Sequence, residues 1–178
     1  FVGMDEKDSP KYAAIRGTGS SFIGEANGSD KNYSFSIFAE KSNDTVHLFE
    51  SAIDLLSYAT LQKLAGKEWR REHLLSLAGV YQPAKEIEKS KVPAALARTL
   101  KMHPEVKTIV LHLDNDRIGR LATKAISTVL TKQYQVKDVP PKQGKDYNDL
   151  LCIKLNLAIT KREKRTKKTM SGHEKNER

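Results

Sequence analysis

The sequence contains a single cysteine, Cys152, so neither a disulfide framework nor a cysteine-rich zinc site can form within the chain. No apolar run approaches the roughly 18 to 20 residues that a membrane-spanning helix needs. The first residues, Phe-Val-Gly-Met-Asp, do not have the character of a signal peptide. We therefore expect a cytoplasmic protein with no membrane association. A start at Phe1, without an initiator methionine, predicts that the chain is a piece of a longer protein.

Basic residues outnumber acidic ones, with 31 Lys and Arg against 22 Asp and Glu and a net charge of +9. This balance suits a polyanionic partner better than a small acidic metabolite. The excess is unevenly distributed, because residues 161–178 contain eight basic and three acidic side chains. About half of the net charge therefore belongs to a polar tail that we expect to be disordered.

Hydrophobic patterning from residue 45 onward predicts alternating strands and helices. Thr108 to Leu113 form a continuous apolar strand that ends in Asp114 and Asp116, and Gly119 opens a helical run. The same order of strand, acidic residue and helix occurs around Val46 to Glu50. The remaining predicted strands are residues 73–78 and 134–139, and helices are expected after residue 51, from Pro93 and after Asp149. Such alternation predicts a Rossmann-type α/β sheet of about four parallel strands flanked by helices.

The first 44 residues have a different pattern. Short alternating stretches at residues 11–16, 22–26 and 33–38 are separated by turns rich in Gly, Ser and Asn, which predicts a small antiparallel β meander. Arg16 and Lys31 within it are candidates for contacts with a nucleic-acid backbone. We therefore divide the chain into a β subdomain (1–44), an α/β domain (45–160) and a basic tail (161–178).

Carboxylates follow several of the predicted parallel strands. Glu50, the pair Asp114 and Asp116, and Asp146 each come after a strand, so one edge of the sheet is expected to collect them. Crowded carboxylates repel one another unless a cation compensates them, and Mg²⁺ is a hard cation that prefers oxygen ligands. Asp54, three residues after Ser51, fits either a helix-capping box or the metal chemistry. His112 lies within the central strand and is expected to be a satisfied core residue.

Two motifs resemble the toprim domain of bacterial primases, type IA and type II topoisomerases and some nucleases. The first is Glu50-Ser-Ala-Ile-Asp54, and the second, about sixty residues later, is Asp114-Asn-Asp116-Arg-Ile-Gly119. A third motif, Gly-x-Asp-x-Asp in primases, is present as residues 144–148, with an asparagine at its last position and Asp149 as a possible substitute. The residues before position 45 are similar to those preceding toprim domains in primase-like proteins of plasmids and conjugative elements.

The resemblance implies a set of roles for these residues. Glu50 would be a general acid/base or a metal ligand, and Asp114 and Asp116 would hold Mg²⁺, with Mn²⁺ as an alternative ion. Asp54 and Asp146 would support a second ion. The family further implies phosphate contacts, for which the candidates in this chain are Arg117, Arg120 and Lys145. The expected partners are single-stranded DNA, nucleoside triphosphates and other domains of the same longer protein.

The leading hypothesis is Mg²⁺-dependent nucleotidyl transfer by a primase-like toprim domain of a plasmid or mobile-element protein. A metal-dependent DNA nuclease of the toprim class and a non-catalytic DNA-binding module are the alternatives. An aspartyl-phosphate phosphatase is disfavoured, because its Asp-x-Asp motif usually follows the first strand. The sequence also departs from the primase pattern: it has no zinc-finger cysteines, and Ser51 and Ala52 replace the Gly and aromatic residue of many primases. No tyrosine has a context that marks it for strand cleavage.

Overall fold

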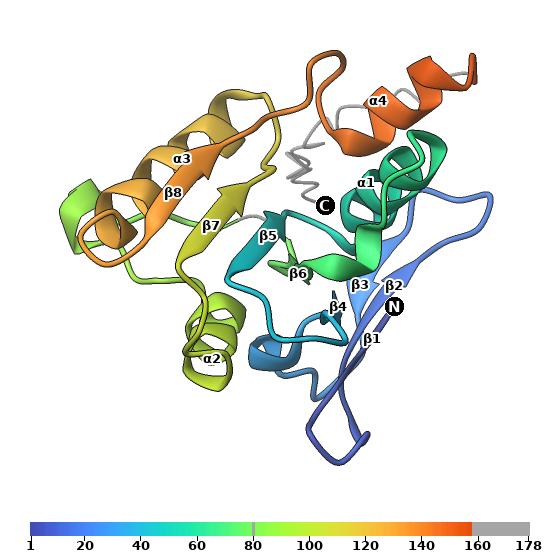
Figure 1. The fold of residues 1–178 in the computed structure, drawn as a ribbon. Coiled ribbons are helices and arrows are strands. Elements are labelled where there is room, and N and C mark those ends of the chain that lie inside the picture. Colours follow the sequence, from blue (N-terminus) through green and yellow to red (C-terminus); the bar gives the residue numbers. More distant parts are fainter. Residues whose placement is uncertain (80, 158–178) are drawn as a thin grey trace, which may run out of the picture.

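The computed structural model describes residues 1–79 and 81–157 (Figure 1). The chain forms a three-stranded antiparallel sheet and a five-stranded mixed sheet. The basic tail expected at residues 161–178 lies outside the described residues. Within the described residues, no helix is long and apolar enough to cross a membrane.

The larger sheet has the strand order β4-β6-β5-β7-β8. Its four parallel strands are β5 (Thr45–Phe49), β6 (His73–Ser76), β7 (Thr108–Leu111) and β8 (Gln135–Asp138). The two central strands and β6 are buried nearly throughout, as expected for a parallel sheet covered on both faces. The predicted α/β fold with about four parallel strands is confirmed.

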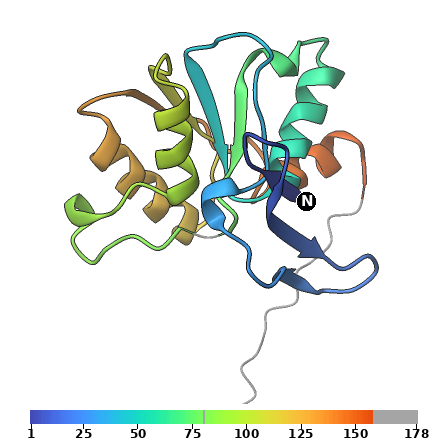
Figure 2. The same cartoon turned by 90° about the horizontal axis from the view of Figure 1, so that it is seen from below.

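Four α-helices cover the two faces of this sheet (Figure 2). They are α1 (Ala52–Leu64), α2 (Ala94–Met102), α3 (Arg117–Leu130) and α4 (Tyr147–Lys154), and three short 3₁₀ segments lie at Lys31–Tyr33, Trp69–Arg71 and Ile87–Lys89. Side chains alternate between faces along a strand. Val46 and Leu48 pack in the cluster that includes α2 and α3, whereas Phe49 packs with Leu55 of α1. Helix α4 lies against α1 on that second face.

The small sheet differs in part from the predicted meander. Its strands are β1 (Val2–Met4), β2 (Pro10–Arg16) and β3 (Ile23–Glu25), in that order, so a strand that the sequence did not indicate takes the outer position. The strand expected at residues 33–38 was wrongly placed. Only β4 (Ser36–Ile37) is extended, and it pairs antiparallel with β6, because Phe35 and Ile37 pack against the core on the α1 face.

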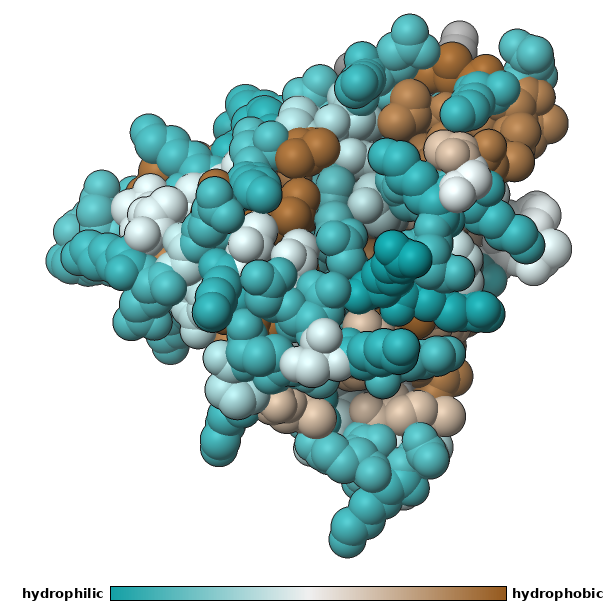
Figure 3. All heavy atoms as spheres, in the orientation of Figure 1, coloured by the Kyte–Doolittle hydropathy of each residue, from teal (hydrophilic) through white to brown (hydrophobic). Residues whose placement is uncertain are grey.

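Apolar side chains gather on the surface over α4, as Figure 3 shows in brown at the upper right. Exposed leucines on α1 and at the end of α4 include Leu56, Leu64, Leu155 and Leu157. Most of the remaining surface in this view is hydrophilic. The apolar area therefore lies beside the point where the described chain ends.

Candidate functional site

The carboxylates predicted to gather at one sheet edge do so. Glu50 follows β5 and Asp114 follows the neighbouring strand β7, and the backbone N–H of Asp114 donates a hydrogen bond of 3.3 Å to Glu50 Oε1. Both residues are buried, with 8% and 6% of their surface exposed. Burial and the nearby charge of Asp114 raise the pKa of Glu50 to about 7. Glu50 therefore exchanges a proton near neutral pH.

Lys145 places a cation between the two members of the Asp-x-Asp pair. Its Nζ atom lies 2.5 Å from Asp114 Oδ2 and 3.3 Å from Asp116 Oδ2. Burial raises the pKa of Asp114 although Lys145 opposes that rise. Burial acts in the same sense on Asp116, but the Gly119 N–H and Lys145 outweigh it and lower that pKa. The pKa of Lys145 is raised, because the hydrogen bond to Asp114 outweighs its own partial burial.

The turn that carries this pair is tightly packed. Asp116 caps α3 by accepting hydrogen bonds of 2.9 Å from the N–H groups of Ile118 and Gly119. A Cβ atom on Gly119 would lie 2.1 Å from the carbonyl oxygen of Asp114. Glycine is therefore required where the helix begins directly against the strand end.

Asp54 has the features of both roles that the sequence left open. The Ser51 hydroxyl donates to Asp54 Oδ2 at 2.5 Å and accepts from the Asp54 N–H at 3.3 Å, which is a helix-start arrangement. The side chain is also buried and accepts a hydrogen bond of 3.4 Å from the Asn148 N–H on its other oxygen. Burial raises the pKa of Asp54 to about 6. The Asp54 carboxylate thus links the helix-capping Ser51 to the third motif.

The third motif closes the acidic edge from the side of α4. Asp146 caps this helix by accepting from the Asp149 N–H at 2.8 Å, and Gly144 adopts a left-handed φ of +77°. Asp149 Oδ2 accepts from the Lys145 N–H at 2.9 Å, so this carboxylate closes the loop. The Asn115 N–H donates to the Lys145 carbonyl at 2.7 Å. The second and third motifs are therefore joined through their backbones.

Arg120 and Arg117 lie on the first turn of α3 but differ in their contacts. The Arg120 guanidinium donates to both oxygens of Asp138 at 2.9 Å and to the carbonyls of Asp114 and Leu113 at 3.1 and 2.9 Å. It thereby ties β8 to the acidic turn, and we do not retain it as a phosphate ligand. Arg117 is exposed at the start of the helix.

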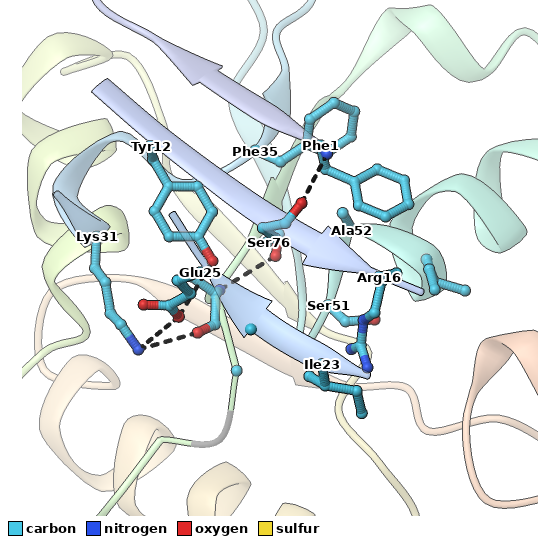
Figure 4. Close-up of a pocket in the computed structure, with 15 residues that line it drawn as sticks. Phe1, Tyr12, Arg16, Ile23, Glu25, Lys31, Phe35, Ser51, Ala52 and Ser76 are labelled. Carbon is cyan, nitrogen blue, oxygen red and sulfur yellow. Dashed lines mark hydrogen bonds and ion pairs between the residues drawn. The ribbon is translucent and has the colours of Figure 1, made fainter. Parts of the chain in front are cut away.

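Arg16 and Lys31 line a pocket of about 410 Å³ between the small sheet and the larger one (Figure 4). Lys31 Nζ lies 2.9 Å from Glu25 and donates to the Ala78 carbonyl at 3.3 Å. The wall also includes Ser51, which directly follows Glu50 in the sequence, so the pocket adjoins the acidic edge. No local pattern in the sequence indicates this pocket, because its walls come from segments far apart in the chain.

A second cluster, which the sequence analysis also missed, lies near the opposite edge of the sheet. Ligand atoms of His73, His103 and Glu105 approach within 4.8 Å of one another. The Ala39 N–H donates to His73 Nδ1 at 3.2 Å, so the proton of a neutral His73 ring lies on Nε2, which disfavours metal binding there. We therefore assign no metal to this cluster. Within the described residues, no three carboxylates of the acidic edge bring their oxygens within 4.8 Å of one another. The Lys145 ammonium lies between two of them.

Comparisons with known proteins support the fold. A curated relative, a 65 kDa protein of Zymomonas mobilis subsp. mobilis, is 30% identical over 180 residues, covering 94% of this chain and 29% of the relative. The crystal structure of the primase fragment of the bacteriophage T7 primase-helicase protein has a similar fold, with a TM-score of 0.56 and 17% identity. That match covers 87% of this chain and 56% of the fragment. The chain thus spans less than a third of its curated relative.

A family match covers the region that carries all three motifs. Residues 47–151 match the family described as Toprim-like, which is more than half of the chain. The match begins in β5 and ends in α4, so it includes the acidic edge and both faces of the parallel sheet. The chain therefore belongs to the Toprim-like family.

Proposed function

We propose that the chain is the nucleotidyl-transfer domain of a primase-like protein that acts on single-stranded DNA with Mg²⁺ or Mn²⁺. The observation that carries the proposal is the convergence of Glu50, Asp114 and Asp116 at the carboxyl edge of the sheet, with a cation already held between two of them. Membership of the Toprim-like family and the fold shared with a T7 primase fragment support it.

The donor set fits a hard divalent cation. Asp114 and Asp116 offer oxygens around a position that now holds the Lys145 ammonium, and Glu50 is hydrogen-bonded beside them. Asp54 and Asp146 are the candidates for a second ion. When bound, the metal would neutralise phosphate charge and orient phosphate oxygens for in-line displacement.

Glu50 is suited to hold the proton that the reaction releases. In nucleotidyl transfer, a 3′-hydroxyl oxygen forms a bond to the α-phosphorus, and the bond from that phosphorus to the pyrophosphate leaving group breaks. The hydroxyl proton needs an acceptor, and a carboxylate with a pKa of about 7 is ionised often enough to accept it and protonated often enough to return it. We assign this role to Glu50.

The basic residues supply the binding side of the proposal. Arg16 and Lys31 line the pocket that adjoins Glu50, where the phosphates of a nucleoside triphosphate or of the DNA backbone can lie. Arg117 is exposed at the start of α3 and is a candidate for contact with the template. The net charge of +9 supports a polyanionic partner, whose affinity should fall steeply with salt.

A priming assay on single-stranded template tests the proposal in the full-length protein that contains this chain. Asp114→Asn and Glu50→Gln should each lower primer synthesis by about two orders of magnitude or more. Glu88→Gln, a change at an exposed carboxylate away from the edge, is the matched control and should leave synthesis intact. Synthesis that is indifferent to both edge variants would refute the proposal. Metal-dependent cleavage of DNA without nucleotides would identify a nuclease instead.

A further inference from the structure

A row of polar side chains, buried except for Glu72 at its outer end, crosses the α1 face of the sheet toward the third motif. It consists of four residues, which we call the buried relay: Glu72, His47, His112 and Tyr147. Glu72 precedes β6 at the amino edge of the sheet, and Tyr147 directly follows Asp146 at the carboxyl edge. The proposed chemistry does not use these residues, yet their contacts are short. His47 Nδ1 lies 2.7 Å from His112 Nε2, and His112 Nδ1 lies 2.7 Å from the Tyr147 hydroxyl.

The Val139 carbonyl fixes the position of the proton on His112. This oxygen only accepts, and it lies 3.1 Å from His112 Nδ1 and 2.9 Å from the Tyr147 hydroxyl, which donates to it. His112 Nδ1 must therefore carry a hydrogen, shared between the carbonyl and the Tyr147 oxygen. The ring is buried, and none of its contacts among the described residues is with a carboxylate, so nothing stabilises a hydrogen on its second nitrogen. Its Nε2 atom is then an acceptor.

The same reasoning sets the donor on the next ring. Because His112 Nε2 accepts, His47 Nδ1 must donate to it. His47 Nε2 lies 2.5 Å from a carboxylate oxygen of Glu72, whose side chain is partly exposed at the amino edge of the sheet. The contact with His47 lowers the pKa of Glu72. Glu72 therefore holds the outer end of His47 in place.

Aromatic packing holds the relay in place. The rings of His47 and His112 are nearly parallel, at 7°, and Phe49 stacks on His112 at 8°. Tyr147 meets His112 edge to face, with ring centroids 5.0 Å apart. From His47 onward, each hydrogen bond points toward the Val139 carbonyl. A chain of hydrogen bonds between packed rings restricts where Tyr147 can lie.

We propose that the buried relay positions the third motif, residues 144–148, against the sheet, so that His112 and Tyr147 are positioning residues of the acidic edge. Tyr147 directly follows Asp146 and begins the helix that Asp146 caps. Lys145, two residues before Tyr147, is the cation between the paired aspartates. A shift of Tyr147 therefore moves both Asp146 and Lys145. The expected effect on metal binding rests on the proposed function. The proton positions in the relay do not depend on it.

The first test reads the proton positions directly. Nitrogen-15 NMR of the histidine rings in the intact chain should show His112 with its proton on Nδ1 and none on Nε2, and His47 with a proton on Nδ1. The Nδ1–H form is the less common neutral tautomer, so its detection on His112 is informative. A proton on His112 Nε2, or a His47 ring without a proton on Nδ1, would overturn the relay.

The second test asks whether the relay positions the motif. Glu72→Gln should weaken the contact with His47 Nε2 and shift the backbone amide signals of residues 144–148 at the far edge, whereas the exposed Glu88→Gln should leave them unchanged. Tyr147→Phe keeps the ring and removes only the hydroxyl. It should shift the same amide signals and weaken Mg²⁺ affinity by about tenfold, as losses behind metal ligands do. Tyr134→Phe, at a partly buried tyrosine packed on the opposite face, is its control.

These outcomes separate the two proposals. Absence of Mg²⁺ binding by the wild-type chain would count against the proposed function alone, because the ring tautomers and amide shifts do not depend on metal. Amide signals of residues 144–148 that stay fixed in both Glu72→Gln and Tyr147→Phe would overturn the positioning role. An Mg²⁺ affinity that is the same in Tyr147→Phe and Tyr134→Phe would overturn it as well.

Discussion

Replacing Lys145 with methionine should make the metal-free protein less stable and should increase its response to Mg²⁺. Methionine keeps most of the side-chain length but removes the ammonium that lies 2.5 Å from Asp114 and 3.3 Å from Asp116. Asp114 is buried, so losing its partner leaves a carboxylate in a poorly solvated place. A hydrogen bond to a charged group contributes about 1.5–3 kcal/mol to the free energy of unfolding. Because the Lys145 side chain is 39% exposed, we expect about 1–2 kcal/mol here.

This loss corresponds to a fall in Tm of about 3–6 °C for a chain of this size. In wild type, an entering ion has to displace the ammonium. The variant has no such competitor, so Mg²⁺ should bind up to about tenfold more tightly, equivalent to roughly 1.4 kcal/mol. Scanning calorimetry with EDTA and with Mg²⁺, together with titration calorimetry, measures both effects. Lys142→Met, at an exposed lysine of the same loop, is the control. If Mg²⁺ stabilises the variant no more than it stabilises wild type, the idea that the Lys145 ammonium occupies the metal site is refuted.

Four further outcomes follow from the contacts of the acidic edge. Mg²⁺ affinity should rise between about pH 6 and pH 8, because Glu50, whose pKa is raised to about 7, becomes an anion beside the ion in this range, and titration calorimetry across it should show a smaller slope in Glu50→Gln. Without metal, the free energy of unfolding should change with pH in the opposite sense. The pKa of Glu50 is higher in the folded than in the unfolded protein, so the protein becomes less stable as pH rises from about 4.5 to 7. Glu50→Gln should flatten that part of the curve of stability against pH. Gly119→Ala should cost about 2 kcal/mol or more in urea unfolding, because the new Cβ would lie 2.1 Å from the Asp114 carbonyl. Arg120→Met should cost about 1–2 kcal/mol by removing its bonds to Asp138 and the acidic turn.

Matched changes on α3 control the last two variants. Thr128→Ala removes a hydroxyl that bonds only within the helix and should change the free energy of unfolding by less than about 0.5 kcal/mol. Arg117→Met removes an exposed charge from the same turn as Arg120. Equal destabilisation by the two arginine variants would contradict a structural role specific to Arg120. A Gly119→Ala protein as stable as Thr128→Ala would show that the turn relaxes easily.

The parallel sheet and its acidic edge were predictable because both depend on local pattern. Continuous apolar runs ending in carboxylates indicate buried strands, and parallel connectivity then brings their ends together whatever the details of packing. Glu50 and Asp114, 64 positions apart, meet for this reason. His112 was expected to be a satisfied core residue, and its contacts with His47 and Tyr147 agree with that.

The rest depended on partners that no local pattern identifies. Lys145 was expected to contact phosphate, but its ammonium lies against Asp114. This contact forms only when the third motif folds over the second, so the sequence does not indicate it. Arg120 has the same spacing from the motif whether it points to solvent or to Asp138. The short strand β4 has too few residues to show which sheet it will join, and packing of Phe35 and Ile37 decides the matter.

The placement of β4 has a consequence for anyone who wishes to separate the α/β domain from the residues before it. Ser36 and Ile37 pair with Leu75 and Leu74, so they cover the outer side of β6. A truncation that starts at residue 45 would remove this cover and leave a row of unpaired N–H and C=O groups on an apolar strand, which invites self-association. A shortened protein that begins at about residue 30, and so keeps β4, should stay monodisperse at concentrations where one beginning at residue 45 aggregates.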